Sequence, residues 1–329
     1  MKVLVSGYGG IAKRHIKNLM SLVNVELMVV VRQSEMDLEQ EYGVPIFVYQ
    51  SFEQALEEHI FDLALICSPA SEHFKQACML FQLGVPCFIE KPVCLNSKEA
   101  KELLKSYKLN PVPALIGYDL RYTEGYLKVS KILSELRLGT IWRLSVDVGQ
   151  YLPDWRPNKP YQTCVSAQKK LGGGVLRELS HELDYLVGLF GLKLDDLSVL
   201  KRNHSNLEMD CENEVIILSL ASIESQFPKV SLNLKMDMLS RKPFRVLKVS
   251  GTEGELVWDL IAQQIIVFQA GVEETISTFD STDQPYLRML KDFIDRVVNS
   301  KCDSGTLKQG IRVMELIEQV EKEGIQIGG

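Results

Sequence analysis

The sequence has no excess of basic residues and no hydrophobic run long enough to cross a membrane. Its 329 residues include 37 Lys and Arg against 43 Asp and Glu, which gives a formal net charge of −6. Nucleic acids and anionic lipid surfaces are usually bound by clustered Lys and Arg, and this mild acidic balance gives no sign of such clusters. No apolar stretch approaches the roughly 20 residues that span a bilayer. The composition therefore predicts partners that are neither nucleic acids nor membranes.

The seven cysteines lack the spacing of a metal or redox site. None forms a C-x-x-C pair, and several lie in apolar runs, such as Cys67 and Cys87. Unpaired thiols in apolar segments are typical of proteins from a reducing compartment. The first residues also carry too short an apolar stretch for a signal peptide. We therefore expect a cytoplasmic protein without a metal.

The first part of the chain alternates continuous apolar runs with helical segments. The runs are 3–5, 25–31, 62–67 and 85–89. Consecutive apolar positions suit strands that helices cover on both faces, as in a doubly wound parallel sheet. A chain of this length also exceeds one ordinary core. We therefore predict an α/β fold with a dinucleotide-binding Rossmann domain over residues 1–119 and a second domain over 120–329.

Beyond residue 120 the pattern changes to alternation with a period of two. Trp142, Leu144, Val146 and Val148 alternate with polar residues, and residues 230–237 do the same. Such alternation indicates one packed face and one solvated face, so the sheet is open and mainly antiparallel. Helices over 286–298 and 307–320 complete an α+β domain for substrate binding and oligomerisation. Its outer face could join a homodimer or homotetramer.

A glycine-rich turn follows the first predicted strand and opens a helix. It reads Gly7-Tyr8-Gly9-Gly10-Ile11-Ala12, which fits G-x-G-x-x-A. The first glycine permits the turn, the second lets the backbone approach a pyrophosphate, and the small Ala12 lets helix and strand pack closely. The strand and helix around the motif make it specific. We therefore predict that NAD or NADP binds here.

The end of the second predicted strand bears on the choice between the two cofactors. Dinucleotide-binding folds usually place Asp or Glu here to hold the ribose 2′-OH of NAD, but this chain has Arg32. Arg32 could hold the 2′-phosphate of NADP, which favours NADP. Glu35 lies close enough in sequence to favour NAD instead.

Two further segments follow predicted parallel strands and would reach the same ligand-binding edge. One contains Ser68, Pro69 and His73, although His73 could equally be an ordinary surface residue. The other is Glu90-Lys91-Pro92, in which Pro92 disfavours helical backbone at Lys91. A lysine in a partly dry cleft can exchange a proton with a hydroxyl or carbonyl.

Together these motifs resemble the Gfo/Idh/MocA family, the relatives of glucose–fructose oxidoreductase and inositol dehydrogenase. The resemblance spans almost the whole chain. Besides the glycine turn through His15 and Glu90-Lys91-Pro92, it includes residues 117–122 and 172–184. It implies a Rossmann domain plus an open-sheet domain, hydride transfer to or from a sugar-like hydroxyl or carbonyl, and a homo-oligomer. It also implies that Lys91 lies beside the nicotinamide and that His181 serves as acid or base.

The chain departs from the family in one place. Many members carry Asp-x-x-x-His, whereas Glu178 precedes His181 by three residues. Positions three apart share a helix face, so Glu178 could still lie near His181, with Asp184 on the same polar face opposite an apolar stripe. The alternative is a solvated surface. We expect catalysis by Lys91, His181 and Glu178.

A loop over residues 149–161 follows a strand of the second sheet. Its aromatic, proline and basic residues suit closure over a polar substrate, while a surface loop or subunit contact would show the same composition. The residues expected to bind substrate are Lys91, Tyr118, Arg121, Trp155, Arg156, Tyr161 and His181. Arg156 would meet an anionic or strongly polar group.

The sequence thus predicts an NAD(P)-dependent oxidoreductase that acts on a sugar or sugar derivative in carbohydrate metabolism. The loop over 149–161 and the segment around His181 resemble those of family members linked with surface-sugar biosynthesis. Two alternatives remain open. The chain could be a catalytically silent nucleotide-binding regulator or scaffold, or it could retain its cofactor tightly and cycle it between two substrates.

Overall fold

A computed structural model describes residues 1–32, 42–224, 229–323 and 325–328. The chain forms two compact units, each with its own sheet. Unit 1 consists of Met1–Asp119 and Asp283–Met314, and unit 2 of Leu120–Thr282 and Glu315–Gly329. The sequence had placed all residues after 119 in the second domain. The segment 283–314 instead packs with unit 1, because the apolar faces of its helices complete that core.

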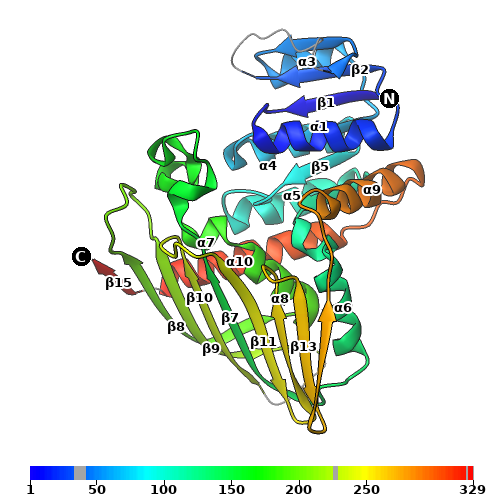
Figure 1. The fold of residues 1–329 in the computed structure, drawn as a ribbon. Helices are drawn as coiled ribbons and strands as arrows, with labels where there is room; N and C mark the ends of the chain where they lie inside the picture. Colours follow the sequence, from blue (N-terminus) through cyan, green and yellow to red (C-terminus); the bar gives the residue numbers. More distant parts are fainter. Residues whose placement is uncertain (33–41, 225–228, 324, 329) are drawn as a thin grey trace. The chain divides into compact units, whose positions relative to one another are not determined.

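Unit 1 contains a parallel sheet of six strands in the order β3-β2-β1-β4-β5-β6 (Figure 1). The strands are β1 Lys2–Ser6, β2 Leu27–Val31, β3 Ile46–Tyr49, β4 Leu63–Ile66, β5 Cys87–Glu90 and β6 Ala114–Gly117. All neighbouring pairs are parallel. Residues 3–5, 28–31, 63–66 and 87–89 of the predicted apolar runs are buried, as helices on both faces require. The doubly wound parallel sheet is confirmed.

The helices of unit 1 come from both of its chain segments. They are α1 Gly10–Leu22, α3 Phe52–Glu58, α4 Ala70–Gln82, α5 Ser97–Leu109, α9 Gln284–Val298 and the first part of α10 Gly305–Glu323. Helix α9 lies against α1 and β6. The ring of Phe293 meets that of Phe88 edge-on at 6.0 Å between centroids. The end of the chain therefore supplies part of the Rossmann core.

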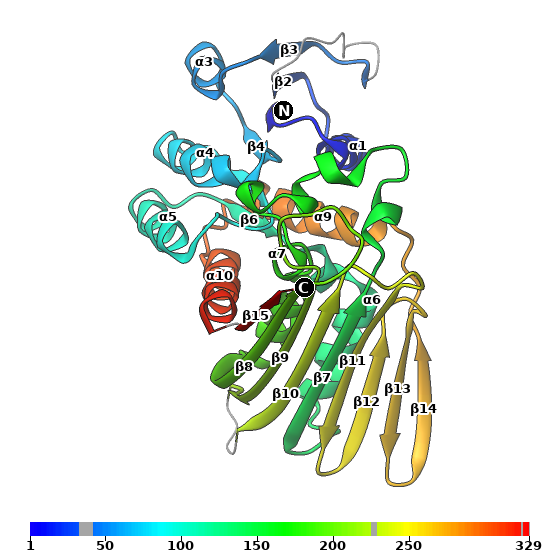
Figure 2. The same ribbon diagram turned by 90° about the vertical axis from the view of Figure 1, so that its left-hand side faces the viewer.

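Unit 2 is built on a sheet of nine strands in the order β14-β13-β12-β11-β7-β10-β9-β8-β15 (Figure 2). The strands are β7 Ile141–Gly149, β8 Lys193–Asn203, β9 Glu214–Ser222, β10 Val230–Asp237, β11 Phe244–Gly251, β12 Gly254–Asp259, β13 Gln264–Gln269, β14 Val272–Ser277 and β15 Ile325–Gly328. Among the described strands, β10 pairs with β7 and β15 with β8 in parallel, and the other pairs are antiparallel. The prediction of a mainly antiparallel sheet is confirmed.

Helices cover one face of this sheet and leave the other without helices in the described chain. The helices of unit 2 are α6 Glu124–Ser134, α7 Val175–Glu178, α8 His181–Phe190 and the last part of α10. The 3-10 turn η1 Asp119–Tyr122 precedes α6, and η2 Leu152–Trp155, η3 Tyr161–Thr163, η4 Val165–Ala167 and η5 Lys169–Leu171 lie between β7 and α7. Helix α6 contacts α8 and β13, and α7 contacts β9 and β10. Strand β10 shows the consequence, since buried and less buried residues alternate along most of it.

Trp142 departs from the predicted alternation. Leu144, Val146 and Val148 are fully buried, but the Trp142 side chain is 50% exposed. The pairing of β7 with β11 shifts by one residue where Gly251 pairs with Ile141. Trp142 is the extra residue of this bulge, so its side chain leaves the packed face.

Candidate functional site

The first glycine of the motif is fixed by the packing of two loops. Gly7 follows β1 with a φ of +85°, and its N–H donates to the carbonyl of Val31. A Cβ added to Gly7 would lie 2.6 Å from the carbonyl oxygen of Cys67 and 2.9 Å from the nitrogen of Ser68. A larger residue would therefore separate the glycine turn from the loop after β4.

The next two glycines border open space. A Cβ on Gly9 or Gly10 would find no atom of the described residues within 4 Å. Gly9 is the N-cap of α1, and the first turn of this helix contains no acidic residue. Free N–H groups, the positive end of the helix dipole and the bare backbone together fit a pyrophosphate. Ala12 is fully buried where α1 packs on the sheet.

Tyr8 gathers two basic side chains beside this turn. The Lys13 Nζ lies 4.7 Å from the centre of the Tyr8 ring, and the Arg32 guanidinium carbon lies 5.2 Å from it. The Tyr8 hydroxyl is 2.9 Å from that of Tyr42. A cleft of about 600 Å³ beside α1 is lined by Lys13, Arg14, Lys17, Asn18, Met20, Tyr42 and Asp283. Glu35, the alternative ribose ligand, lies outside the described residues.

Glu90 and Lys91 stand at the carboxyl end of β5, as predicted. Glu90 is 8% exposed, and its Oε2 accepts a hydrogen bond of 3.0 Å from the backbone N–H of Lys91. Its Oε1 lies 2.5 Å from Nε2 of the fully buried His15. Gly117, opposite Glu90 on β6, makes room for this carboxylate, because a Cβ there would lie 3.2 Å from it. The position of the Glu90 carboxylate is thus fixed by its hydrogen-bond partners and by the space at Gly117.

His73 is buried between the loops after β4 and β5 rather than exposed at the surface. Its Nδ1 lies 2.8 Å from the carbonyl oxygen of Pro92, and its Nε2 lies 2.9 Å from that of Ser68. Burial lowers the pKa of the imidazole. Pro69 is the N-cap of α4. The predicted residues Ser68, Pro69, His73, Glu90 and Lys91 therefore gather at one edge of the unit 1 sheet, with His73 enclosed by backbone carbonyls.

In unit 2, the predicted catalytic segment is two helices and not one. Helix α7 ends at Glu178, Leu179 and Ser180 form a turn, and α8 begins at His181. Glu178 and His181 are half-buried, whereas Ser180 is completely buried. The expectation of one continuous helix, with Glu178 and His181 on one face, was wrong. A run of apolar residues at helical spacing does not reveal a break of two residues.

Asp184 is also not on a solvated face. It is fully buried and receives two hydrogen bonds of 2.6 Å, from Nε and Nη2 of Arg121. Nη2 also donates to the backbone carbonyl of Asp184 at 3.0 Å. Arg121 thus ties η1 to α8, and its predicted role in substrate binding stays a prediction. Tyr118, the neighbouring candidate in unit 1, is 3% exposed.

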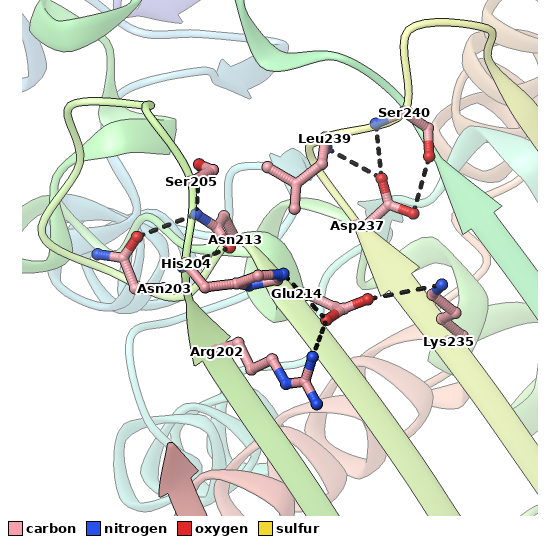
Figure 3. A network of polar contacts seen from close by, with 10 residues as sticks. All are labelled: Arg202, Asn203, His204, Ser205, Asn213, Glu214, Lys235, Asp237, Leu239 and Ser240. Atoms are coloured by element: carbon pink, nitrogen blue, oxygen red, sulfur yellow. Dashed lines mark hydrogen bonds and ion pairs between the residues drawn. The ribbon is translucent and has the colours of Figure 1, made fainter. Parts of the chain in front are cut away.

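The predicted substrate loop runs beside the end of β10. The N–H groups of Gln150 and Leu152 donate to the carbonyls of Asp237 and Met238 at 3.1 and 3.0 Å. Asp237 in turn accepts hydrogen bonds from the backbone of Leu239 and Ser240 (Figure 3). These contacts fix the beginning of the loop.

The rest of that loop differs in exposure from residue to residue. Arg156 is exposed, and Trp155 is half-buried with an indole N–H that finds no acceptor among the described residues. The hydroxyl of Tyr161 accepts a hydrogen bond from the backbone N–H of Glu208 at 3.0 Å. Arg156 is therefore the most exposed of these three residues.

Two polar residues near these sites were not among the predicted site residues. His15 lies on the buried stripe of α1 between Ala12 and Leu19, and a histidine on such a stripe is the signal that could have revealed it. Glu212 follows no motif. Its carboxylate lies against Gly174, where a Cβ would be 2.4 Å from Oε1, and burial raises its pKa. A sequence pattern cannot bring Glu212 to the glycines of 172–174.

The described residues contain neither a cluster of metal ligands nor a membrane-spanning helix. No group of three or more His, Cys, Asp and Glu side chains there could hold a metal ion. None of the described helices is long and apolar enough to cross a membrane.

Residues 1–118 match the model of the GFO_IDH_MocA family, an oxidoreductase family with an NAD-binding Rossmann fold. The N-terminal domain belongs to the Gfo/Idh/MocA family. This confirms the resemblance inferred from the glycine turn and the Glu-Lys-Pro motif. It also confirms the prediction that the cofactor is a nicotinamide dinucleotide.

Similar proteins match stretches of the chain longer than the first domain. Oxidoreductase P35 of Formosa agariphila is 23% identical over 172 residues, which are 51% of this chain and 53% of that protein. Glucose-6-phosphate 3-dehydrogenase of Bacillus subtilis is 25% identical over 71% of this chain and 66% of its own length. The chain thus spans about half the length of the first of these relatives.

The fold of the whole chain is shared with solved structures. The UDP-N-acetylglucosamine 3-dehydrogenase GnnA of Acidithiobacillus ferrooxidans has a TM-score of 0.77 and 19% identity over 98% of this chain and 97% of that one. At this identity the likeness shows the fold, which pairs a Gfo/Idh/MocA Rossmann domain with an open sheet.

Proposed function

We propose that this Gfo/Idh/MocA protein is an NAD(P)-dependent oxidoreductase that transfers a hydride to or from a hydroxyl or carbonyl of a sugar derivative, in the biosynthesis of surface sugars. The observation that carries the proposal is the bare backbone of Gly9 and Gly10 at the start of α1. This place fits a pyrophosphate, and Lys91 follows a parallel strand of the same sheet at the same edge.

The nicotinamide, when bound, supplies the hydride chemistry, and the chain supplies binding and proton exchange. Lys91 and His181 exchange the proton of the reacting hydroxyl, and Glu178 orients the segment that leads to His181. The N–H groups of the glycine turn hold the pyrophosphate. Relatives that act on glucose 6-phosphate and on a UDP-sugar support a sugar as substrate.

NADP is the preferred cofactor in this proposal. Lys13 and Arg32 both approach the Tyr8 ring, so two cations lie beside the end of β2 where a 2′-phosphate would bind. We expect Arg32→Ala to weaken NADPH binding more than NADH binding. Equal losses, measured by fluorescence titration of both nucleotides, would contradict the preference.

The substrate carries an anionic group that Arg156 binds. Arg156 is exposed in a loop whose beginning is fixed by backbone hydrogen bonds, and guanidinium groups suit phosphates and carboxylates. Arg156→Lys should raise KM strongly for a charged sugar and much less for a neutral one. If this variant instead changes the molecular mass and leaves KM intact, the loop is a subunit contact.

The protein is a homo-oligomer through the outer face of the unit 2 sheet. Leu218, Leu220 and Phe268 on this face are each about half exposed. On the same face, Arg202, His204 and Lys235 surround the mostly buried carboxylate of Glu214 at 3.5–3.7 Å (Figure 3). Apolar side chains on the same face as a cluster of paired charges suit a protein interface. The seven free thiols fit a reducing cytoplasm.

The test is a screen of sugars, sugar phosphates and nucleotide sugars with NADP and NAD, followed by nicotinamide absorbance. We expect turnover with at least one anionic sugar. Lys91→Met and His181→Ala should then lower kcat by about 10²–10⁴-fold while nucleotide binding persists. Lys98→Met, an exposed lysine on α5, is the matched control and should leave kcat unchanged. Tight nucleotide binding without turnover of any sugar would favour a silent regulator.

A further inference from the structure

The backbone at Lys91 is anchored on both sides by buried groups. On one side, Glu90 accepts the N–H of Lys91 with Oε2 and contacts His15 with Oε1. On the other, the carbonyl of Pro92 lies 2.8 Å from the ring of His73. His15 is 0% exposed and His73 is 1% exposed. Each anchor thus joins Lys91 to a helix, His15 on α1 and His73 on α4.

We propose that His15 and His73 are positioning residues that hold the backbone of Lys91 for proton exchange. The proposal rests on the catalytic role proposed for Lys91. Neither histidine is a catalytic residue in it, because both act through a neighbour of Lys91 and are enclosed by protein.

The chemistry of the His15 contact supports a fixed carboxylate. An ionised carboxylate only accepts hydrogen bonds, so Nε2 of His15 donates to Oε1 of Glu90. Nδ1 of His15 is buried and has no hydrogen-bond partner among the described residues. The ring is wedged edge-on against Phe88 at 4.7 Å and Tyr286 at 5.9 Å between centroids. The polar contact of His15 described here is therefore the one that holds the Glu90 carboxylate.

Glu90 passes this constraint to Lys91. Both of its oxygens are engaged, and Gly117 leaves the space that its carboxyl group fills. If the donor on His15 is lost, Oε1 of Glu90 becomes a buried acceptor without its donor. This cost favours another rotamer of the Glu90 side chain. The hydrogen bond to the Lys91 N–H would then be lost as well.

His73 fixes Pro92, the residue that follows Lys91. Carbonyl oxygens of Ser68 and Pro92 face its two nitrogens, and a neutral imidazole donates to one of them. Removal of this ring would free the loop after β5 from the loop after β4. Small displacements of a positioned group can cost about 10²-fold in rate. The anchors are thus expected to affect turnover without any contact to the nucleotide.

Two pairs of variants separate positioning from packing. His15→Phe keeps an aromatic ring between Phe88 and Tyr286 but loses the donor, whereas His15→Gln keeps a donor near the place of Nε2. His73→Phe removes the second anchor. His59→Phe is the matched control, since His59 is a partly exposed histidine of the same unit that contacts Tyr49. Melting temperature and NADPH affinity are measured for each variant.

The first readout needs no substrate. Hydrogen exchange at the Lys91 amide should become about tenfold faster in His15→Phe and stay near wild type in His15→Gln and His59→Phe. The second readout is kcat with the sugar found in the screen. It should fall by about 10- to 100-fold in His15→Phe and His73→Phe, recover most of its value in His15→Gln, and leave NADPH affinity unchanged.

Each result decides the inference. Unchanged exchange and kcat in His15→Phe would overturn it, as would faster exchange with normal kcat. A kcat loss of equal size in His15→Phe and His15→Gln that follows the melting temperature would mean packing alone. Full turnover in Lys91→Met would reject the proposed role of Lys91, and with it the catalytic purpose of the anchors, while the exchange data would still show whether His15 holds this backbone.

Discussion

Gly7 and Gly9 lie two residues apart and have different environments, which separates folding from nucleotide binding. Gly7 has a positive φ and touches the backbone of Cys67, so Gly7→Ala should lower the free energy of unfolding by about 1–3 kcal/mol. Gly9 has an extended backbone, and a Cβ there would find no atom of the described residues within 4 Å, so Gly9→Val should fold normally. Its side chain would occupy the space of the pyrophosphate and weaken NADPH binding about tenfold or more. Denaturant unfolding and nucleotide titration of both variants test this; unchanged affinity in Gly9→Val would remove the nucleotide from this place.

His73 should make stability depend on pH. Burial is the main cause that lowers its pKa in the folded protein, while the backbone carbonyls of Pro92 and Ser68, and after them Glu90 and Glu72, act in the opposite direction. The unfolded chain therefore binds more protons than the folded chain at pH values below about 6.5. The stabilisation is fully present above this pH and is lost as pH falls toward the folded pKa. His73→Leu should lose less stability between pH 7.5 and 5.5 than wild type in urea unfolding, and an equal loss would contradict this origin.

Individual residues were predictable where a backbone requirement is local. The glycine turn and Glu90-Lys91-Pro92 could be identified because their spacing follows from strand, turn and helix. The contacts of His15 with Glu90 and of Glu212 with Gly174 could not, since each joins residues far apart in sequence. The roles of Lys91, His181 and Arg156 stay predictions for the kinetic tests above.

At the scale of elements, the bidentate pair of Arg121 and Asp184 joins η1 to α8. Asp184 is fully buried, so removal of Arg121 would take a bidentate counter-charge away from a buried carboxylate. Arg121→Met should therefore lower the free energy of unfolding by about 3–5 kcal/mol. Normal stability with a raised KM would support the substrate role that the sequence predicted. Arg143→Met, an exposed arginine of β7, serves as the control.

Element types followed from periodicity more reliably than element boundaries did. Continuous apolar runs marked β1, β2, β4 and β5, whereas β3 and β6 were not predicted. Strand length does not explain this difference, because β4 and β5 have four residues each, as β3 and β6 do. The turn at Leu179–Ser180 interrupts a stripe that remains apolar across the break. Hydrophobic spacing records which residues are buried and not whether the helix is continuous.

At the scale of the whole molecule, the outer face of the unit 2 sheet should govern assembly. Leu218→Lys with Leu220→Glu places charges on neighbouring outward positions of β9, where burial in an interface would be costly. We expect this double variant to reduce the molecular mass in light scattering while its monomers stay folded. Leu109→Lys on α5, an exposed leucine of unit 1, should leave the mass unchanged. A wild-type protein that is itself monomeric would contradict the proposed interface.

The two-segment construction of unit 1 has a consequence for synthesis on the ribosome. Translation delivers residues 1–119 long before 283–314, yet α9 covers α1 and brings Phe293 to Phe88. The nascent Rossmann sheet therefore keeps an apolar surface exposed while all of β7–β14 is translated. Exposed apolar surface of this kind is bound by chaperones and promotes aggregation. A nascent chain arrested before residue 283 should remain protease-sensitive and associated with a chaperone, and release to full length should end both.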